Sequence, residues 1–462
     1  MGRLSQEMIA LFGSRVGVAA IGMVTSIVLA RGLGPHDRGL LALALLLPST
    51  LVTMTKLGIT QANVYCSRRE GAPLAQVASN SLVLALLLGV GAAVVVWCAQ
   101  DPLRDTVLRG LPAWALLLAL WRLPLLLIDN YFWGVLQAMG RFSVYNRRTL
   151  AGAGGVLVGL VLLWAVGRLN LYGALLVYAL ATSFVVTSLL WTVHRLLPFG
   201  FHVDRSLLMR QLKFGSKSYA QILTMHLLFR SDVYLVAYFL DPARTAFYSL
   251  ALHFTEMLLE IPQAVGWVIY PKLASLEKAE VHRTTALTCR RVLLVTTLAG
   301  GTLVMVGPWF IPLWYGKSFA PAAEPLPFAA VGALAMAVFT ILSRDFTSRN
   351  RQLVNVFAGI VALGTNLGLN VVFIPKWGIV GAALATAVAY SLAAGLLLAF
   401  FRVESGIRLH EVLLPQRSDI VATWRSALQP FERHIARAAL VQRVLPRSWN
   451  RAGAGKTGSA LK

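Results

Sequence analysis

Apolar segments follow one another almost without interruption from Ile9 to Phe401, and this pattern constrains the fold more than any other feature of the sequence. An α-helix needs about 20 apolar residues to cross about 30 Å of hydrocarbon. Only 13% of the 462 residues are Asp, Glu, Lys or Arg, which is about half of the roughly 25% typical of soluble domains. No polar linkers divide the segments into soluble domains. We therefore predict an all-α polytopic membrane protein.

Twelve segments are long enough to cross a bilayer. We place them at about 8 to 30, 39 to 62, 77 to 99, 112 to 134, 149 to 167, 171 to 194, 214 to 239, 245 to 270, 289 to 311, 322 to 343, 353 to 374 and 378 to 401. The predicted organisation is a six-helix bundle over 1–198, a second over 199–403, and a basic cytoplasmic tail over 404–462. No cleavage pattern follows the first segment, so we expect that helix to remain in the chain.

Basic residues are unequally divided between the two sets of loops. One set holds Arg68, Arg69, Arg141, Arg147, Arg148, Arg195, Arg205, Arg210, Lys213, Lys272, Lys278, Arg283, Arg290, Arg291, Arg344, Arg349 and Arg351. The other holds Arg31, Arg38, Arg104, Arg109, Arg168, Arg244, Lys317 and Lys376. Because Lys and Arg are enriched in cytoplasmic loops, both termini are predicted to be cytoplasmic. The net charge of +23 therefore indicates membrane topology and not nucleic-acid binding.

The two predicted halves repeat several short motifs. Gly13-Ser14-Arg15 recurs as Gly215-Ser216-Lys217, Leu33-Gly34-Pro35 as Leu240-Asp241-Pro242, and Tyr172-Gly173-Ala174-Leu175 as Val380-Gly381-Ala382-Ala383. Each half has an even number of helices, so both halves would have the same orientation in the membrane. We therefore predict a pseudo-two-fold axis along the membrane normal, with a central cavity between the halves.

Polar residues at helical spacing are predicted to face that cavity. The second segment carries Ser49, Thr53, Lys56, Thr60 and Asn63, the eighth carries His253, Glu256, Glu260, Gln263 and Trp267, and the seventh carries Lys217, Gln221, Thr224, Ser231 and Asp232. The alternative is that hydroxyls bond carbonyls of their own helix or link helices together. That alternative does not cover the charged residues, which are costly in a bilayer and indicate function by default.

The charged residues of these helices suggest different roles. Arg15 and Lys217 occupy equivalent repeat positions and would together hold a phosphate, unless they extend to the lipid headgroups. Arg122 and Asp129 lie seven residues apart on one helix, too far apart for a direct ion pair, so each is expected to pair with another helix. Glu256 and Glu260 are candidates for ion coupling, with a structural pair to Arg230 or Lys56 as the alternative.

The last residues, about 60 in number, are typical of a membrane-surface segment. Ile420, Trp424, Leu428, Phe431 and Ile435 recur at helical spacing opposite basic residues, which predicts an amphipathic helix on the inner leaflet. The three cysteines have no metal-binding spacing and imply no disulfide framework. No phosphate-binding loop of the G-x-x-x-x-G-K-[ST] type occurs, so we expect neither direct use of ATP nor any other cofactor.

Several degenerate motifs occur in the order of a known family. They are Ile-Val-Leu-Ala-Arg-Gly-Leu-Gly-Pro over 27–35 followed by Gly39, Arg230-Ser-Asp232, Tyr248-Ser-Leu-Ala251, Gln137-Ala-Met-Gly-Arg141, Tyr270-Pro271 and Ile379-Val-Gly-Ala-Ala383. With these motifs the chain resembles the O-antigen and exopolysaccharide flippases of the multidrug, oligosaccharidyl-lipid and polysaccharide exporter superfamily. Ala246 departs from the usual glycine, and twelve segments are fewer than the fourteen of some relatives.

The resemblance implies a non-enzymatic transporter that flips a polyprenyl-pyrophosphate-linked oligosaccharide to the outer leaflet of the bacterial inner membrane by alternating access. Arg15, Lys56, Arg122 and Lys217 would then bind the pyrophosphate, and Asp129, Asp232, His253, Glu256 and Glu260 would line the cavity or couple an ion. A polysaccharide polymerase and glycosyltransferases of the same pathway are the implied partners. The alternatives are a multidrug or cation antiporter of the same superfamily and a membrane-embedded glycan polymerase or ligase, which the short outer loops disfavour.

Overall fold

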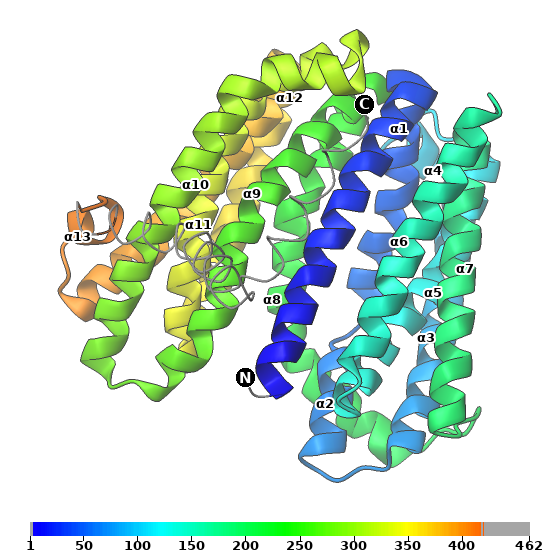
Figure 1. The fold of residues 1–462 in the computed structure, drawn as a ribbon, viewed down its shortest axis with the longest axis horizontal. Helices are drawn as coiled ribbons and strands as arrows, with labels where there is room; N and C mark the ends of the chain where they lie inside the picture. The colour runs from blue at the N-terminus through cyan, green and yellow to red at the C-terminus, as the bar shows by residue number, and fades with distance from the viewer. Residues whose placement is uncertain (1–2, 417–418, 420–462) are drawn as a thin grey trace, which may run out of the picture.

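The computed structural model describes residues 3–416 and 419, with side chains except at 1–16, 217–218 and 278–279, and this part of the chain is almost entirely helical (Figure 1). The first helices are α1 Arg3–Thr55, α2 Ile59–Arg68, α3 Leu74–Cys98, α4 Gln100–Asp105, α5 Ala113–Ala138, α6 Phe142–Ala165 and α7 Leu171–Leu196. They are followed by α8 Arg205–Phe239, α9 Pro242–Ser275, α10 Lys278–Tyr315, the 3-10 helix η1 Lys317–Ala323, α11 Leu326–Ser348, α12 Gln352–Ser405 and α13 Leu409–Leu413. The predicted amphipathic tail helix lies outside the described residues.

Nine helices of the described chain are long and apolar enough to cross a membrane. They include α3, with a mean hydropathy of 2.5 over its most apolar window, and the 54-residue α12, with a mean hydropathy of 2.0. Because these helices satisfy their own backbone hydrogen bonds, their apolar side chains can face lipid. The protein is thus an all-α polytopic membrane protein, as its apolar segments predict.

Two of the longest helices reverse direction at a single glycine. In α1 Gly34 has φ 72° and in α12 Gly378 has φ 60°, and glycine adopts this left-handed backbone region without a Cβ clash. The reversal of α12 brings Arg349, just before its start, to Glu404 at its end. In α1, Arg38 donates to Ser26 across the turn at 3.4 Å. The loop predicted between residues 30 and 39 is therefore wrong, because one glycine makes the turn and both flanks stay helical.

The second predicted segment, 39 to 62, is not one helix. It breaks between α1 and α2, where Leu57 and Gly58 both have positive φ. The polar residues predicted to share one helical face are consequently divided. Ser49 and Thr53 lie on α1, whereas Asn63 is buried on α2 and donates to Ser81 and to the carbonyl of Tyr131. This stripe is therefore wrong as a single face, because the left-handed residues redirect its second part.

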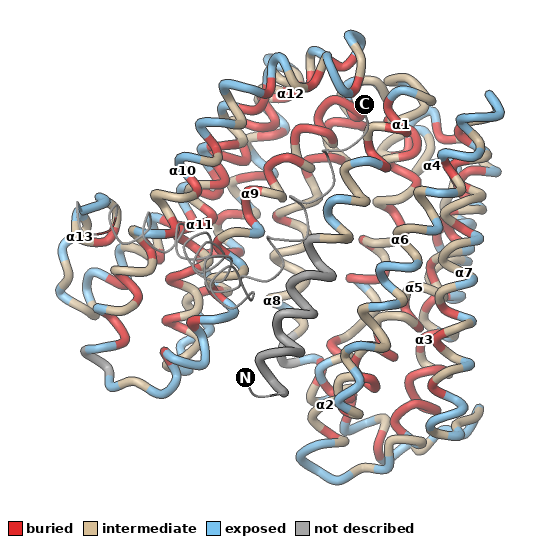
Figure 2. The backbone as a smooth tube through the Cα atoms, viewed as in Figure 1, coloured by how far each residue is buried: buried red, intermediate tan, exposed pale blue. Residues whose placement is uncertain are grey.

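The helices form two groups in Figure 1, with α1, α3 and α5 to α7 in one and α9 to α12 in the other, and α8 between them. Buried residues, red in Figure 2, lie mainly where helices face one another, and the outward faces are more exposed. The groups meet where α1 packs on α9 and where α2 packs on α8. Arg31 of α1 also donates to the carbonyls of Leu313 and Trp314 in the last turn of α10, at 2.6 and 2.7 Å. A space remains between the groups beside these contacts.

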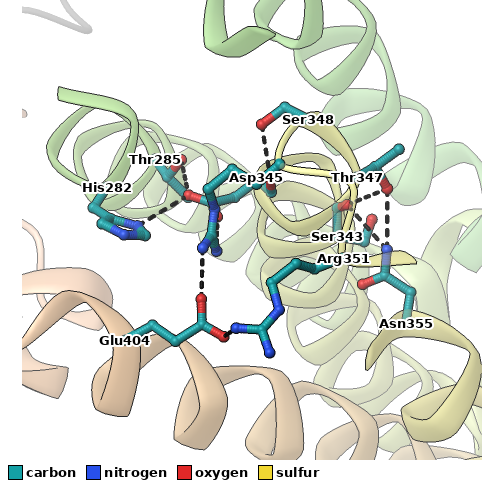
Figure 3. A network of polar contacts seen from close by, with 10 residues as sticks. His282, Thr285, Ser343, Asp345, Thr347, Ser348, Arg351, Asn355 and Glu404 are labelled. Carbon is teal, nitrogen blue, oxygen red and sulfur yellow. Dashed lines mark hydrogen bonds and ion pairs between the residues drawn. The ribbon is translucent and has the colours of Figure 1, made fainter. Parts of the chain in front are cut away.

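A polar network joins α10, α11 and α12 at one end of the second group (Figure 3). Buried Asp345 accepts hydrogen bonds from Thr285 at 2.9 Å and from Arg349 Nε at 2.7 Å. Glu404 accepts from Arg349 at 2.5 Å and from Arg351. Each carboxylate thus faces a guanidinium, as a charge that is shielded from water requires.

Candidate functional site: an arginine-lined cavity

A cavity of about 690 Å³ lies between the two groups of helices. Its walls come from α1, α5, α6 and α7 of the first group and from α8 and α9. This volume is within the roughly 300 to 1,000 Å³ of typical ligand sites. Most of the lining is apolar, and a small number of polar groups interrupt it. Those groups determine what the cavity can bind.

Arg122 of α5 is the predicted binding residue that lines this cavity. Its Nε donates to Thr182 of α7 at 3.1 Å, and its guanidinium carbon lies 5.4 Å from the centre of the Tyr178 ring. Its Nη1 is buried without a hydrogen-bond partner among the described residues. The expectation that Arg122 pairs with another helix is confirmed, but its partners are neutral and leave its positive charge uncompensated.

Three more arginines line the same cavity. Arg38 donates to Ser26, Arg148 donates to Ser188 and Thr192, and Arg230 forms an ion pair with Glu256 at 2.6 Å. The placement of Arg38 and Arg148 in loops was wrong. The helix α1 continues through residue 38, and α6 already begins at Phe142. Among these four arginines, Arg230 alone has a carboxylate partner within ion-pair distance in the described structure.

The acidic lining is smaller than the basic lining. Asp129 of α5 and Glu256 of α9 are its two carboxylates among the described residues, and His253 lies one turn from Glu256. Tyr145 of α6 donates to Asp129 at 3.4 Å, so Asp129 also pairs with another helix, as predicted. Of the two predicted partners for Glu256, the structure shows Arg230. Four arginines against two carboxylates leave this cavity cationic.

The remaining predicted residues lie elsewhere. The side chains of Arg15 and Lys217 are outside the described residues. Lys56 sits in the break between α1 and α2, and Glu260 is exposed on α9 one turn beyond Glu256. Neither of these two residues lines the cavity. Asp232 is fully buried in a separate polar network of the second group.

That network surrounds the Asp232 carboxylate with donors. Tyr248 donates to it at 2.5 Å, Thr386 at 3.2 Å, and the backbone N–H of Val233 at 2.8 Å. Asn366 donates to Thr386 and Asn370 donates to Asn366, which extends the network along α12. The fully buried Asp232 carboxylate is thus held by neutral donors on three helices, α8, α9 and α12.

Sequence reasoning missed Arg38, Arg148 and Tyr145 as lining residues. Arg148 and Tyr145 are three residues apart, a spacing that places them on one helical face. Their helix was predicted to begin at residue 149, whereas α6 begins at Phe142. Ser188 and Thr192, four residues apart on the next helix, were a usable signal, because paired hydroxyls of this kind suit a guanidinium.

The architecture and the site together define a class of protein. A polytopic helical protein with a large cavity between two groups of helices, lined by a few charged side chains, has the form of a membrane transporter. Among the described residues, no group of three or more His, Cys, Asp or Glu side chains is placed to hold a metal ion.

A family model described as "Polysaccharide biosynthesis protein" matches residues 4–277. The chain belongs to this polysaccharide biosynthesis family, and the family resemblance found in the sequence motifs is confirmed.

Two curated relatives come from Haloferax volcanii. The chain is 25% identical over 167 residues to "Probable low-salt glycan biosynthesis flippase Agl15" and 26% identical over 170 residues to "Probable flippase AglR". Each match spans 35% of this chain and 35% of the relative, so the chain matches about a third of the length of these proteins.

Solved transporter structures share the fold. The lipid II flippase MurJ in an inward closed conformation matches with a TM-score of 0.72 and 15% identity, over 92% of both chains. An inward-facing multidrug resistance MATE family transporter of the MOP superfamily matches with a TM-score of 0.66 and 17% identity, over 84% of this chain and 94% of that chain. At these identities the likeness establishes the fold alone.

Proposed function

We propose that this protein flips a polyprenyl-pyrophosphate-linked oligosaccharide from the inner to the outer leaflet of a bacterial inner membrane by alternating access. The product would supply the assembly of a surface polysaccharide such as O-antigen or exopolysaccharide. The family and the flippase names of the two archaeal relatives support the general activity. A polysaccharide polymerase and glycosyltransferases of the same pathway are proposed as partners.

The proposed architecture has two six-helix halves, 1–198 and 199–403, with both termini cytoplasmic. Twelve crossings follow if α1 and α12 each cross twice, divided at Gly34 and Gly378, and each of the other eight long helices crosses once. This count includes α9, which is not among the nine apolar spans of the described chain.

The observation that carries the proposal is the excess of arginine in the cavity. Ionisable groups within the bilayer cost several kcal/mol unless they are paired or hydrated. Arg38, Arg122 and Arg148 have neutral hydroxyl partners, which satisfy N–H donors but leave the charge. A pyrophosphate offers several anionic oxygens and suits guanidinium groups. Arg15 and Lys217 stay proposed contacts from the sequence alone, whereas Lys56 does not line this cavity.

The test is lipid flipping by the purified protein in liposomes, with Arg122→Gln and the double change with Arg38→Gln. Loss of a charge-assisted contact typically costs about 1.5 to 3 kcal/mol, so each change should slow flipping about tenfold or more. The double change should be non-additive, because both arginines would act on one ligand.

Arg109→Gln is the matched control, because Arg109 is exposed, lies outside the cavity and carries the same charge. It should keep wild-type flipping. Normal flipping by the double variant at equal protein levels would exclude Arg122 and Arg38 from the binding site.

A multidrug or cation antiporter is the second candidate, because a MATE transporter shares the fold. Cationic drugs would favour an acidic cavity, whereas four arginines face two carboxylates here. Uptake of a cationic dye by the same liposomes, unaffected by Arg122→Gln, would favour the antiporter. A glycan polymerase or ligase is disfavoured by the short connections between the long helices of the described chain.

A further inference from the structure

The polar groups of the cavity are separated along α5. Arg122 and Asp129 are seven residues apart, which is a rise of about 10 Å on nearly the same helical face. Tyr145 of α6 contacts Asp129, and Arg148 and Thr149 follow Tyr145 by about one turn on the same helical face and also line the cavity. The cavity therefore has an arginine part at Arg122 and a mixed part that begins at Asp129, where a carboxylate, a guanidinium and two hydroxyls line the wall within about one helical turn of Tyr145.

Asp129 has unused capacity to accept hydrogen bonds. An ionised carboxylate offers about four acceptor positions. In the described structure its one hydrogen bond is the 3.4 Å contact from Tyr145, and no cation lies within 4.0 Å of it. A carboxylate that lines a membrane-embedded cavity in this state needs further donors, and water or a ligand must supply them.

The neighbours of Asp129 are held in place by the helices behind them. Arg148 is fixed by Ser188 and Thr192 of α7. The Tyr145 ring packs on Trp133 of α5, with ring centres 4.1 Å apart. The polar groups at this end are thus arranged before a ligand arrives, which lowers the cost of binding.

A carboxylate, a guanidinium and two hydroxyls on one cavity wall suit a ligand ring that carries several hydroxyl groups. Each hydroxyl both donates and accepts, so one hydroxyl of the ring can donate to Asp129 while another accepts from Arg148. A second phosphate does not fit as well, because Asp129 would repel it.

We propose that Asp129, Tyr145, Arg148 and Thr149 form a sugar-binding subsite beside the pyrophosphate site. The proposal deepens the proposed function and rests on it. The subsite makes the transporter prefer the glycan-loaded lipid over bare polyprenyl pyrophosphate, because the bare lipid leaves the Asp129 carboxylate unpaired. A site built to bond hydroxyls discriminates strongly against a ligand that lacks them.

The test is native mass spectrometry of the purified full chain with two probes at equal concentration. One probe is the polyprenyl-pyrophosphate glycolipid fraction extracted from the cells that make this protein, and the other is polyprenyl pyrophosphate alone. We expect the wild type to bind the glycolipid at least about tenfold better. Asp129→Asn should lower that preference about tenfold and leave binding of the bare lipid within about twofold.

Two further variants keep the test decisive. Tyr145→Phe retains the ring and removes the hydroxyl, so it should lower the preference by a smaller factor and serves if Asp129→Asn fails to fold. Asp105→Asn changes an exposed aspartate outside the cavity and should keep the wild-type preference.

Equal preference in the wild type and in both subsite variants would overturn the subsite and leave the pyrophosphate site intact. Parallel loss of both lipids in folded Asp129→Asn would also overturn it, because Asp129 would then act on the cavity as a whole. Failure of the wild type to bind either lipid would overturn the proposed function itself.

Discussion

At the residue scale, the partners of a charged group indicate its role better than its position in the sequence. Arg230 and Glu256 both line the cavity, but their 2.6 Å ion pair neutralises them. Arg122 lines the same cavity with neutral partners and one buried unpaired N–H. Charge available for a ligand is therefore concentrated on Arg122, Arg38 and Arg148.

Asp232 is proposed as a coupling residue, because it is fully buried outside the cavity and joins three helices through neutral donors. We expect Asp232→Asn to slow flipping about tenfold. The amide is neutral, so the hydrogen bonds from Tyr248 and Thr386 lose the charge assistance that the carboxylate gives them. Binding of polyprenyl pyrophosphate should stay within about twofold, because Asp232 does not line the cavity.

Flipping assays in liposomes with and without an imposed proton or sodium gradient would test this role. The gradient should accelerate the wild type and the control Asp105→Asn, but not Asp232→Asn. An Asp232→Asn protein that still responds to the gradient would exclude Asp232 from coupling.

At the element scale, reversals within single helices determine which residues come together. The turn at Gly378 places both ends of α12 beside α11, where Arg349, Arg351 and Glu404 meet. Asp345 then links Arg349 to Thr285 of α10 (Figure 3). This polar network holds three helices of the second group in register at one end.

We expect Glu404→Gln to destabilise the protein, because it removes the carboxylate that two arginines share. The loss of charge-assisted bonds to largely buried Arg349 should lower the free energy of unfolding by about 1.5 to 3 kcal/mol. Unfolding in a series of detergent mixtures, followed by circular dichroism, measures this change. Glu324→Gln, at an exposed site, should leave stability unchanged, and an equal midpoint for both variants would contradict a stabilising role for the network.

At the scale of the whole molecule, two groups of helices meet around the arginine-lined cavity. Arg31 joins α1 to the end of α10, and α2 packs on α8 at the other end of α1. Alternating access requires that such contacts open and close while each group stays packed. Each group has buried clusters of its own, and a further buried cluster joins Ala30 and Leu43 of α1 to residues of α8 to α12 where the groups meet.

We expect both termini to be cytoplasmic, because the loops on that side carry most of the Lys and Arg residues between segments. Fusions of a fluorescent reporter and of an exported phosphatase to either terminus test this topology. Fluorescence without phosphatase activity at both ends is the expected result, and phosphatase activity at either end would require an odd number of crossings or the opposite orientation.

The sequence by itself determined the class of the fold and the family. Hydropathy depends only on the composition along the chain. The order of the motifs can be recognised even though each motif is degenerate, so neither feature requires knowledge of tertiary contacts. Arg122 and Asp129 were likewise identifiable, because charges inside long apolar segments are rare.

Only the tertiary structure decided where helices turn and which charges share the cavity. Hydropathy cannot separate a one-residue reversal at Gly34 from a loop, and it placed Arg38 and Arg148 outside the helices. The left-handed residues Leu57 and Gly58 likewise divided a stripe that had a continuous period in the sequence. Side-chain direction depends on where each helix begins and on which helix packs against it, and both follow from long-range contacts that local sequence does not encode.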